Sequence, residues 1–209
     1  LAINYQVLLP DAKFTGYGYN DKGDNLLRFW YIALSPIYEN QWKNYSHLNL
    51  DDFSILPAKY KLRLDVPDHF TVQSNLKKYK TENGVHYFSG QHKREVSLFF
   101  SNNNPFQTFK LNDNRFILTD IFKKNENSEV NFIKVSRIDK FVSNFFDFEG
   151  EKKYLVPALI YNKNPFFGLN DLPEFLAPFN DLFLDELSFL KSYLHIYLSN
   201  NLNIDLRRD

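Results

Sequence analysis

The hydrophobic pattern of the chain changes at about residue 112, and this change limits the possible folds more than any other feature. Before it, apolar and charged residues alternate with a period of two, most clearly at residues 60–66, which the turn pair Pro67-Asp68 follows. After it, apolar residues have the spacing of helices and of buried strands. The sequence therefore predicts an α+β fold in two domains, residues 1–111 and residues 112–209.

Short segments rich in aromatic and β-branched residues recur through the first domain, as is typical of β-strands. Clusters of Gly, Asn and Asp separate them and favour turns or left-handed backbone. The strand candidates are residues 28–32, 60–66, 86–89 and 96–100, and the turn candidates are residues 16–18, 20–23, 82–84 and 102–105. We expect an antiparallel β-sandwich or a saddle-shaped antiparallel sheet.

The second domain combines strands with two helices. Residues 116–121 are typical of a strand, and the apolar run at residues 154–161 predicts a strand covered on both faces, with Pro157 favouring an edge or a bulge. A helix is expected over residues 130–146, and a last helix begins at the N-cap Asp181. The faces expected to be buried are Ile133, Ile138, Phe141, Val142 and Phe145 in the first helix and Phe183, Leu187, Leu190, Leu194 and Tyr197 in the second.

Composition excludes several classes of function. The chain has no cysteine, which rules out disulfides, thiolate nucleophiles and cysteine metal ligands. Lys plus Arg and Asp plus Glu both number 25, so no net field draws the protein to nucleic acid, and we expect no nucleic-acid partner. The Lys-Lys-Tyr-Lys run at residues 77–80 suits stacking of a single-stranded base or an exposed turn between strands, and the neutral overall charge favours the turn.

Two further features of composition concern the membrane and the extent of the chain. No apolar run reaches the roughly 18 to 20 residues that cross a bilayer, so we expect no transmembrane segment. Methionine is absent, even at position 1, so we expect a processed chain or a part of a longer protein.

The common sequence motifs of catalysis are missing. No two of the five histidines, at positions 47, 69, 86, 92 and 195, have the i, i+4 spacing of a helical metal site. The sequence also has no hydrolase nucleophile elbow, no phosphate-binding P-loop and no dinucleotide-binding glycine motif. Adjacent acids such as Asp185-Glu186 point to different sides of a helix and favour a solvated or capping role.

Three stretches of the sequence carry a resemblance to a known family. They are GYGYNDKGDNLLRFWYIALSPIYENQW at residues 16–42, AKYKLRLDVPDHFTVQSN at residues 58–75 and YLVPALIYNKNPFFGLNDLP at residues 154–173. In this order and spacing they resemble the amino-terminal part of the membrane-alanyl aminopeptidase family of gluzincin zinc peptidases. The resemblance implies that family's N-terminal β-domain, followed by part of a thermolysin-like α/β lobe that ends in a long helix.

The resemblance also implies a substrate-binding loop at Gly168, Leu169, Asn170 and Asp171. The family pattern there is G-[AG]-M-E-N, and its glutamate holds the free amino group of the substrate. Asn170 lacks the charge of that glutamate, whereas the adjacent Asp171 carries a charge of the same sign.

The last helix resembles the family's zinc-binding helix, which bears H-E-x-x-H. Both histidines of that motif bind zinc and its glutamate is the general base, whereas here Lys191, Ser192 and His195 occupy these positions. A catalytic zinc needs three protein ligands and one open position. We therefore expect no catalytic residue and no cofactor in this chain, and His195 is either a vestigial metal ligand or a hydrogen-bonded core residue.

These features predict a non-catalytic aminopeptidase-like protein, or a fragment of one, that binds a protein or peptide. The alternative is the N-terminal part of an active zinc aminopeptidase whose catalytic residues lie outside this chain. A third interpretation is carbohydrate or cell-surface binding by the aromatic β-domain. The resemblance and the Asn-, Lys- and Phe-rich composition favour an exported bacterial protein, either periplasmic or at the cell surface.

Overall fold

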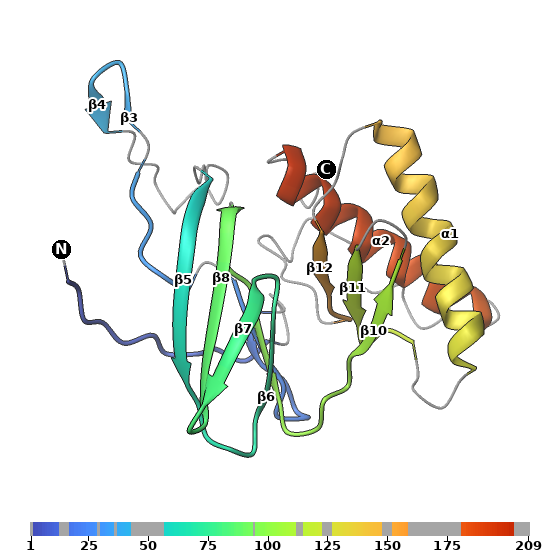
Figure 1. The fold of residues 1–209 in the computed structure, drawn as a ribbon, viewed down its shortest axis with the longest axis horizontal. Coiled ribbons are helices and arrows are strands. Elements are labelled where there is room, and N and C mark those ends of the chain that lie inside the picture. The colour runs from blue at the N-terminus through green and yellow to red at the C-terminus, as the bar shows by residue number, and fades with distance from the viewer. Residues whose placement is uncertain are drawn as a thin grey trace.

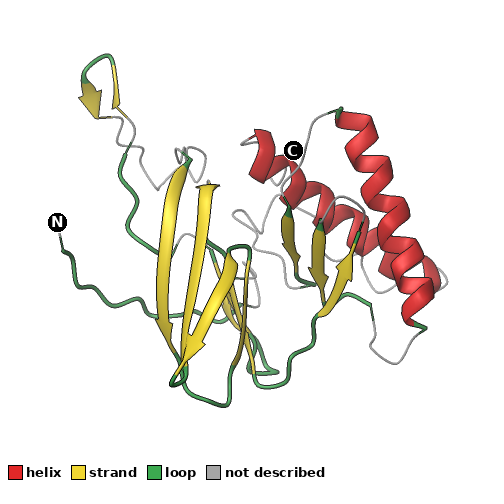
Figure 2. Cartoon of the chain, viewed as in Figure 1, coloured by secondary structure: helices red, strands yellow, loops and turns green. Residues whose placement is uncertain are grey.

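The computed structural model describes most of the chain (Figure 1). The described residues are 2–12, 17–28, 30–35, 37–42, 57–93, 95–111, 115–122, 127–147, 152–158 and 181–202. Within them, strands fill the N-terminal part, and two helices accompany a smaller sheet in the C-terminal part (Figure 2). Antiparallel pairs predominate. The fold is therefore α+β, as the sequence predicts.

Two antiparallel sheets form the N-terminal part, with the strand orders β1-β2-β9-β6 and β5-β8-β7. The strands of the first sheet are β1 (Gly18–Tyr19), β2 (Asn25–Leu27), β6 (Thr71–Ser74) and β9 (Leu98–Ser101), and those of the second are β5 (Ala58–Asp65), β7 (Lys77–Glu82) and β8 (Val85–Lys93). Leu27, Val72 and Leu98 of the first sheet share one buried cluster with Phe88 of the second. The two sheets therefore pack against each other around a common apolar core.

The strand β5 and the turn after β7 have the structures that the sequence predicts. Side chains of β5 alternate between exposed and half-buried from Lys59 to Asp65, as a strand with one wet face requires. The chain turns between β7 and β8 at Asn83 and Gly84, whose φ angles are 49° and 78°. Positive φ at both positions is typical of a tight hairpin turn.

Two predictions in this part are wrong. A strand is expected at residues 28–32, but the strand in this region, β2, ends at Leu27. The residues after it belong to a loop, in which Arg28 is buried and the indole of Trp30 donates to Val96 O at 3.2 Å. The exposed turn expected at residues 77–80 is part of strand β7. All its side chains are exposed, so it lacks the apolar alternation by which a half-buried strand is recognised.

A separate hairpin and a second set of strands complete the described elements. The hairpin of β3 (Ile37–Tyr38) and β4 (Gln41–Trp42) stands apart from the sheets (Figure 1). The remaining elements are β10 (Gln107–Lys110), β11 (Phe116–Thr119), α1 (Ser128–Phe146), β12 (Lys153–Val156) and α2 (Asp181–Leu202). β10 pairs with β11 antiparallel and β11 with β12 parallel, and α1 makes the crossover between the parallel strands.

The alternation of side chains in β11 and β12 decides what covers each face of the C-terminal sheet. On one face, Ile117, Tyr154 and Val156 are buried against residues of both helices. Leu118 and Leu155 point to the other face and bury with residues of the N-terminal part. The sheet thus lies between the helices and the N-terminal strands. β12, which Pro157 follows, is an edge strand of this sheet, as the sequence predicts.

The buried faces of both helices differ from those predicted. Helix α1 buries Asn131, Val135, Ile138 and Val142, so only Ile138 and Val142 of the predicted face are confirmed. The other predicted residues of α1 are largely exposed: Ile133 62%, Phe141 61% and Phe145 71%. Apolar residues occupy more than one side of α1, and the sequence alone does not show which side meets the sheet.

Helix α2 buries an aromatic stripe at i, i+4 and i+8 that consists of Phe189, Tyr193 and Tyr197. The ring of Tyr154 in β12 packs edge-on to Tyr193, with ring centres 5.2 Å apart. Of the residues predicted to be buried in α2, Tyr197 is confirmed. The predicted burial of Leu187 is wrong, since its side chain is 54% exposed. The side chain of Phe183 lies outside the described residues.

One apolar cluster crosses from the N-terminal to the C-terminal part. Leu26, Phe99 and Phe106 bury their side chains with Leu118 and Leu155. β10 also lies before residue 112, where the sequence pattern places the domain boundary, but pairs with β11 after it. The C-terminal sheet therefore takes strands from both sides of that position.

Candidate functional site

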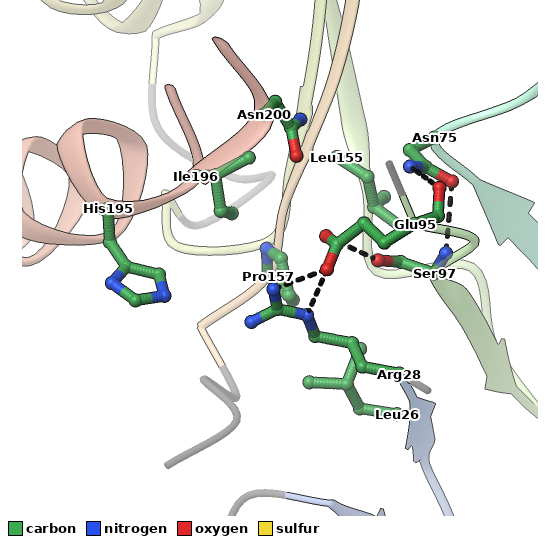
Figure 3. Close-up of a pocket in the computed structure, with 10 residues that line it drawn as sticks. All are labelled: Leu26, Arg28, Asn75, Glu95, Ser97, Leu155, Pro157, His195, Ile196 and Asn200. Carbon is green, nitrogen blue, oxygen red and sulfur yellow. Dashed lines mark hydrogen bonds and ion pairs between the residues drawn. The ribbon is translucent and has the colours of Figure 1, made fainter. Parts of the chain in front are cut away.

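The structure places one of the site residues that the sequence singles out. His195 lies in α2, is 6% exposed, and faces a small pocket between this helix and the N-terminal part (Figure 3). The expected substrate-binding residues Gly168, Leu169, Asn170 and Asp171 lie outside the described residues.

The pocket beside His195 is small, with polar side chains at several points of a mostly apolar lining. The space in it that the centre of a water molecule can reach is about 20 Å³, which is room for about one water molecule and not for a substrate side chain. His195 and Asn200 come from α2, and Glu95, Asn75 and Ser97 lie on the opposite side, with Arg28 between them (Figure 3). All of these polar residues except Asn200 are less than a tenth exposed.

Arg28 and Glu95 form a buried ion pair at this pocket. The Nε atom of Arg28 donates to Glu95 Oε2 at 2.9 Å, its Nη2 atom donates to the same oxygen, and Ser97 Oγ donates to Oε1 at 3.1 Å. The two charged side chains are 8% and 9% exposed. Buried charges are tolerated when they are paired and hydrogen-bonded. The charge of Glu95 is therefore balanced by Arg28.

Asn75 holds the backbone around Glu95 in place. Its Nδ2 atom donates to Glu95 O at 3.0 Å, and its Oδ1 atom accepts from the backbone N–H of Ser97, also at 3.0 Å. Asn75 thus satisfies backbone groups on both sides of Val96 in a segment that has no strand partner there. The position of the carboxylate follows from this fixed backbone.

Two half-buried lysines lie near this network. Burial lowers the pKa of Lys93 to about 8, while the charge of nearby Glu95 acts in the opposite direction. Burial, reinforced by the charges of Lys78 and Lys93, lowers the pKa of Lys153 to about 8. Lys153 Nζ donates to Leu76 O at 3.0 Å and so connects β12 to the link between β6 and β7. These lysines are charged at neutral pH and lose their protons a little above it.

The helix position that resembles a zinc-binding motif brings one histidine to the pocket. His195 is buried at the pocket, but Lys191, one turn earlier, is exposed, and Ser192 donates its hydroxyl to Ser188 O of the same helix at 2.8 Å. Nowhere in the described part of the chain do three His, Asp or Glu side chains come together in a group that could hold a metal ion. The donors at this position do not fit a catalytic zinc, which requires three protein ligands.

A second polar cluster ties the two helices to the C-terminal sheet. Asp139 of α1 accepts from Arg115 Nη1 at 2.8 Å and from the hydroxyl of Tyr193 of α2. Burial and the charge of Asp139 raise the pKa of Tyr193, so its phenol stays a donor. Nearby, Asn201 Nδ2 donates to the hydroxyl of Tyr154 at 3.1 Å. This cluster connects α1 to α2 and to the C-terminal sheet.

The Arg28–Glu95 pair is absent from the site that the sequence predicts. The two residues are 67 positions apart, and no spacing rule connects them. The signal for this pair in the sequence is weak. Each of the two is a charged residue directly beside an aromatic or apolar run, where a buried charge needs a partner. Their pairing depends on how β2 and β9 meet in the folded sheet.

Comparison with known proteins gives no relative: the chain has no significant match to a protein-family model, to a curated protein or to a solved structure. Neither of the described helices combines the length and the apolar composition needed to cross a bilayer.

Proposed function

We propose that this chain is a non-catalytic relative of the aminopeptidase family, or a part of one, and that it acts by binding a protein or a peptide. The observation that carries the proposal is the chemistry of α2. His195 faces the pocket at the junction, whereas Lys191 is exposed and Ser192 is bonded to its own helix. A lone imidazole does not supply the three ligands of a catalytic zinc.

The order of the elements supports the resemblance on which this proposal depends. A β-rich N-terminal part is followed by the strand β11, the helix α1, the parallel strand β12 and the long helix α2. The resemblance implies the same order, with the zinc-binding motif on the last helix. In that order, residues 191–195 are where the metal ligands of an active member belong.

The charges at the pocket also support binding over hydrolysis. Hydrolysis by a metal-bound water needs a carboxylate base that is free to take a proton. The carboxylate that lines this pocket, Glu95, is held by Arg28 and Ser97. Ser192, at the position of the family's general base, has no carboxylate. The proposed role of the chain is therefore recognition.

The first experiment measures zinc and peptidase activity in the same preparation. The purified chain is loaded with zinc, desalted and analysed for metal content, and hydrolysis of amino-acid anilides is followed with and without a chelator. We expect no zinc retained in proportion to protein and no chelator-sensitive hydrolysis. His195→Ala tests the one ligand that remains, and Lys191→Ala is the matched control at an exposed position of the same helix.

Two results would overturn the proposal. One is a zinc ion per chain that His195→Ala removes and Lys191→Ala leaves in place. The other is hydrolysis that the chelator abolishes. If H-E-x-x-H follows in a longer polypeptide that contains this chain, the alternative holds instead, and the chain is the N-terminal part of an active zinc aminopeptidase.

A further inference from the structure

The strand β5 has a free edge that is long and regular. It is the first strand in the order β5-β8-β7, and no other described strand pairs with its outer side (Figure 1). Its register with β8 shifts once, between Ala58 and Tyr60, and is continuous from Tyr60 to Asp65. This regular stretch is about 20 Å long. Open edges of this kind accept an added strand through backbone hydrogen bonds.

The two sides of β5 differ in chemistry. Lys61 and Arg63 are exposed on the outer face of the sheet. Tyr60, Leu62 and Leu64 alternate with them, point to the core and are half-buried. A strand added to β5 would place its side chains directly opposite these residues, in the same alternation.

We propose that the free edge of β5 binds an extended peptide segment in which acidic and apolar side chains alternate. The inference rests on the binding role proposed above and names its partner. Acidic side chains would lie opposite Lys61 and Arg63, and apolar side chains would cover Tyr60, Leu62 and Leu64. The same cations disfavour a second copy of β5, because the antiparallel register that centres the two strands sets Lys61 opposite Arg63.

The chemistry of the outer face favours a peptide over a nucleic acid. The ring of Tyr87, in the centre of the face, is already flanked by Lys80 Nζ at 5.7 Å and by the ring of Tyr79 at 6.2 Å. The basic region ends at two acids, Asp65 of β5 and Glu82 of β7, which are both aligned with Val85 of β8. On β5 the basic side runs only from Lys59 to Arg63, about 13 Å or four residues along the strand. Tight binding of a polynucleotide needs more consecutive phosphate contacts than this.

The opposite edge of the same sheet provides a matched control. Across β8, Lys61 is aligned with Lys77 and Arg63 with Lys80, so the edge strand β7 carries cations on the same face. β7 is a poor receptor, however, because its register with β8 shifts between Lys78 and Lys80 and none of its side chains is buried. A bulge of this kind protects an edge from pairing.

The experiment measures binding of a fluorescent peptide with a Val-Glu-Val-Glu-Val core to the intact chain, by fluorescence anisotropy. The controls are a Val-Lys-Val-Lys-Val peptide and a single-stranded oligonucleotide. Lys61→Glu with Arg63→Glu reverses the charge at the β5 edge, and Lys77→Glu with Lys80→Glu makes the same change at β7. Thermal melting checks that both variants fold. Hydrogen exchange of the β5 amides, with and without peptide, locates the site.

We expect the acidic peptide to bind the unchanged chain, and more weakly as salt rises. The β5 reversal should weaken it by about tenfold or more and confer binding of the lysine peptide, while the β7 reversal changes affinity by less than about threefold. Equal loss in both variants, tighter binding of the oligonucleotide, or unprotected β5 amides would overturn the inference. If the acidic peptide fails but other peptides in an unbiased array bind independently of β5, the binding role survives and the β5 site does not. If no peptide binds, both fail.

Discussion

Removing the charge of Glu95 should destabilise the protein more than any other change to an ion pair among the described residues. The side chains of Arg28 and Glu95 are 8% and 9% exposed, so Glu95→Met leaves the guanidinium of Arg28 in the pocket without its counter-charge. It also removes the acceptor of the Ser97 hydroxyl. Breaking a buried pair by removing one partner typically costs about 3–5 kcal/mol. We expect a loss of that size in the free energy of unfolding, measured by urea titration with circular dichroism.

Two comparisons separate this mechanism from a general effect of substitution. In the double variant, Arg28→Met with Glu95→Met, no charge remains buried, so most of the loss should be recovered. The matched control is Glu82→Gln, because the Lys80–Glu82 pair is about half exposed on both sides, and we expect it to cost less than about 1 kcal/mol. The reasoning is refuted if Glu95→Met costs no more than Glu82→Gln, or if the losses of the two single variants simply add in the double variant.

Other buried polar groups give further expectations. Asn131→Leu should raise the free energy of unfolding by about 1–2 kcal/mol in the same titration, because Asn131 is fully buried and its amide has no hydrogen-bond partner among the described residues; a loss would show that the amide is satisfied. Tyr193→Phe should lower it by about 1.5–3 kcal/mol, since the donor to the Asp139 carboxylate is removed, and an unchanged melting temperature would contradict this role. Burial lowers the pKa of Lys93 and Lys153 to about 8 in the folded chain. Between about pH 8 and about pH 10 these lysines are therefore mostly deprotonated in the folded chain but still protonated in the unfolded chain. Stability should therefore rise with pH across this range. Lys153→Met should flatten that rise, and a profile that falls from pH 8 would refute the assignment.

The sequence predicts elements well where local chemistry decides the structure. The strand β5 follows from its alternation, and the turn at Asn83 and Gly84 follows from residues that adopt positive φ. Helix α1 follows from its apolar spacing, and its N-cap Asn127 accepts from the backbone N–H of Glu129 at 3.0 Å. Each of these features is set by residues a few positions apart.

Long-range packing explains what the sequence does not predict. Phe141 and Phe145 are large and apolar, yet they stay exposed and pack on each other with ring centres 6.1 Å apart, while Asn131 is buried. The buried side of α1 is the one that meets the sheet and α2, and a helix with apolar residues on several sides does not specify that side by itself. Likewise, His195 is visible in the sequence as a histidine in an apolar helix, but its pocket depends on residues from β2 and the segment before β9.

The apolar cluster shared by Leu26, Phe99 and Leu118 determines where the polypeptide tolerates division. Cleavage between β10 and β11 would leave β10 at the end of one fragment without its partner strand. It would also expose Phe109 and Ile117, which are buried in the intact chain. Each fragment would lose part of an apolar cluster that is buried in the intact chain. Gene fusions, circular permutants and domain exchanges should therefore keep the N-terminal and C-terminal parts in one polypeptide.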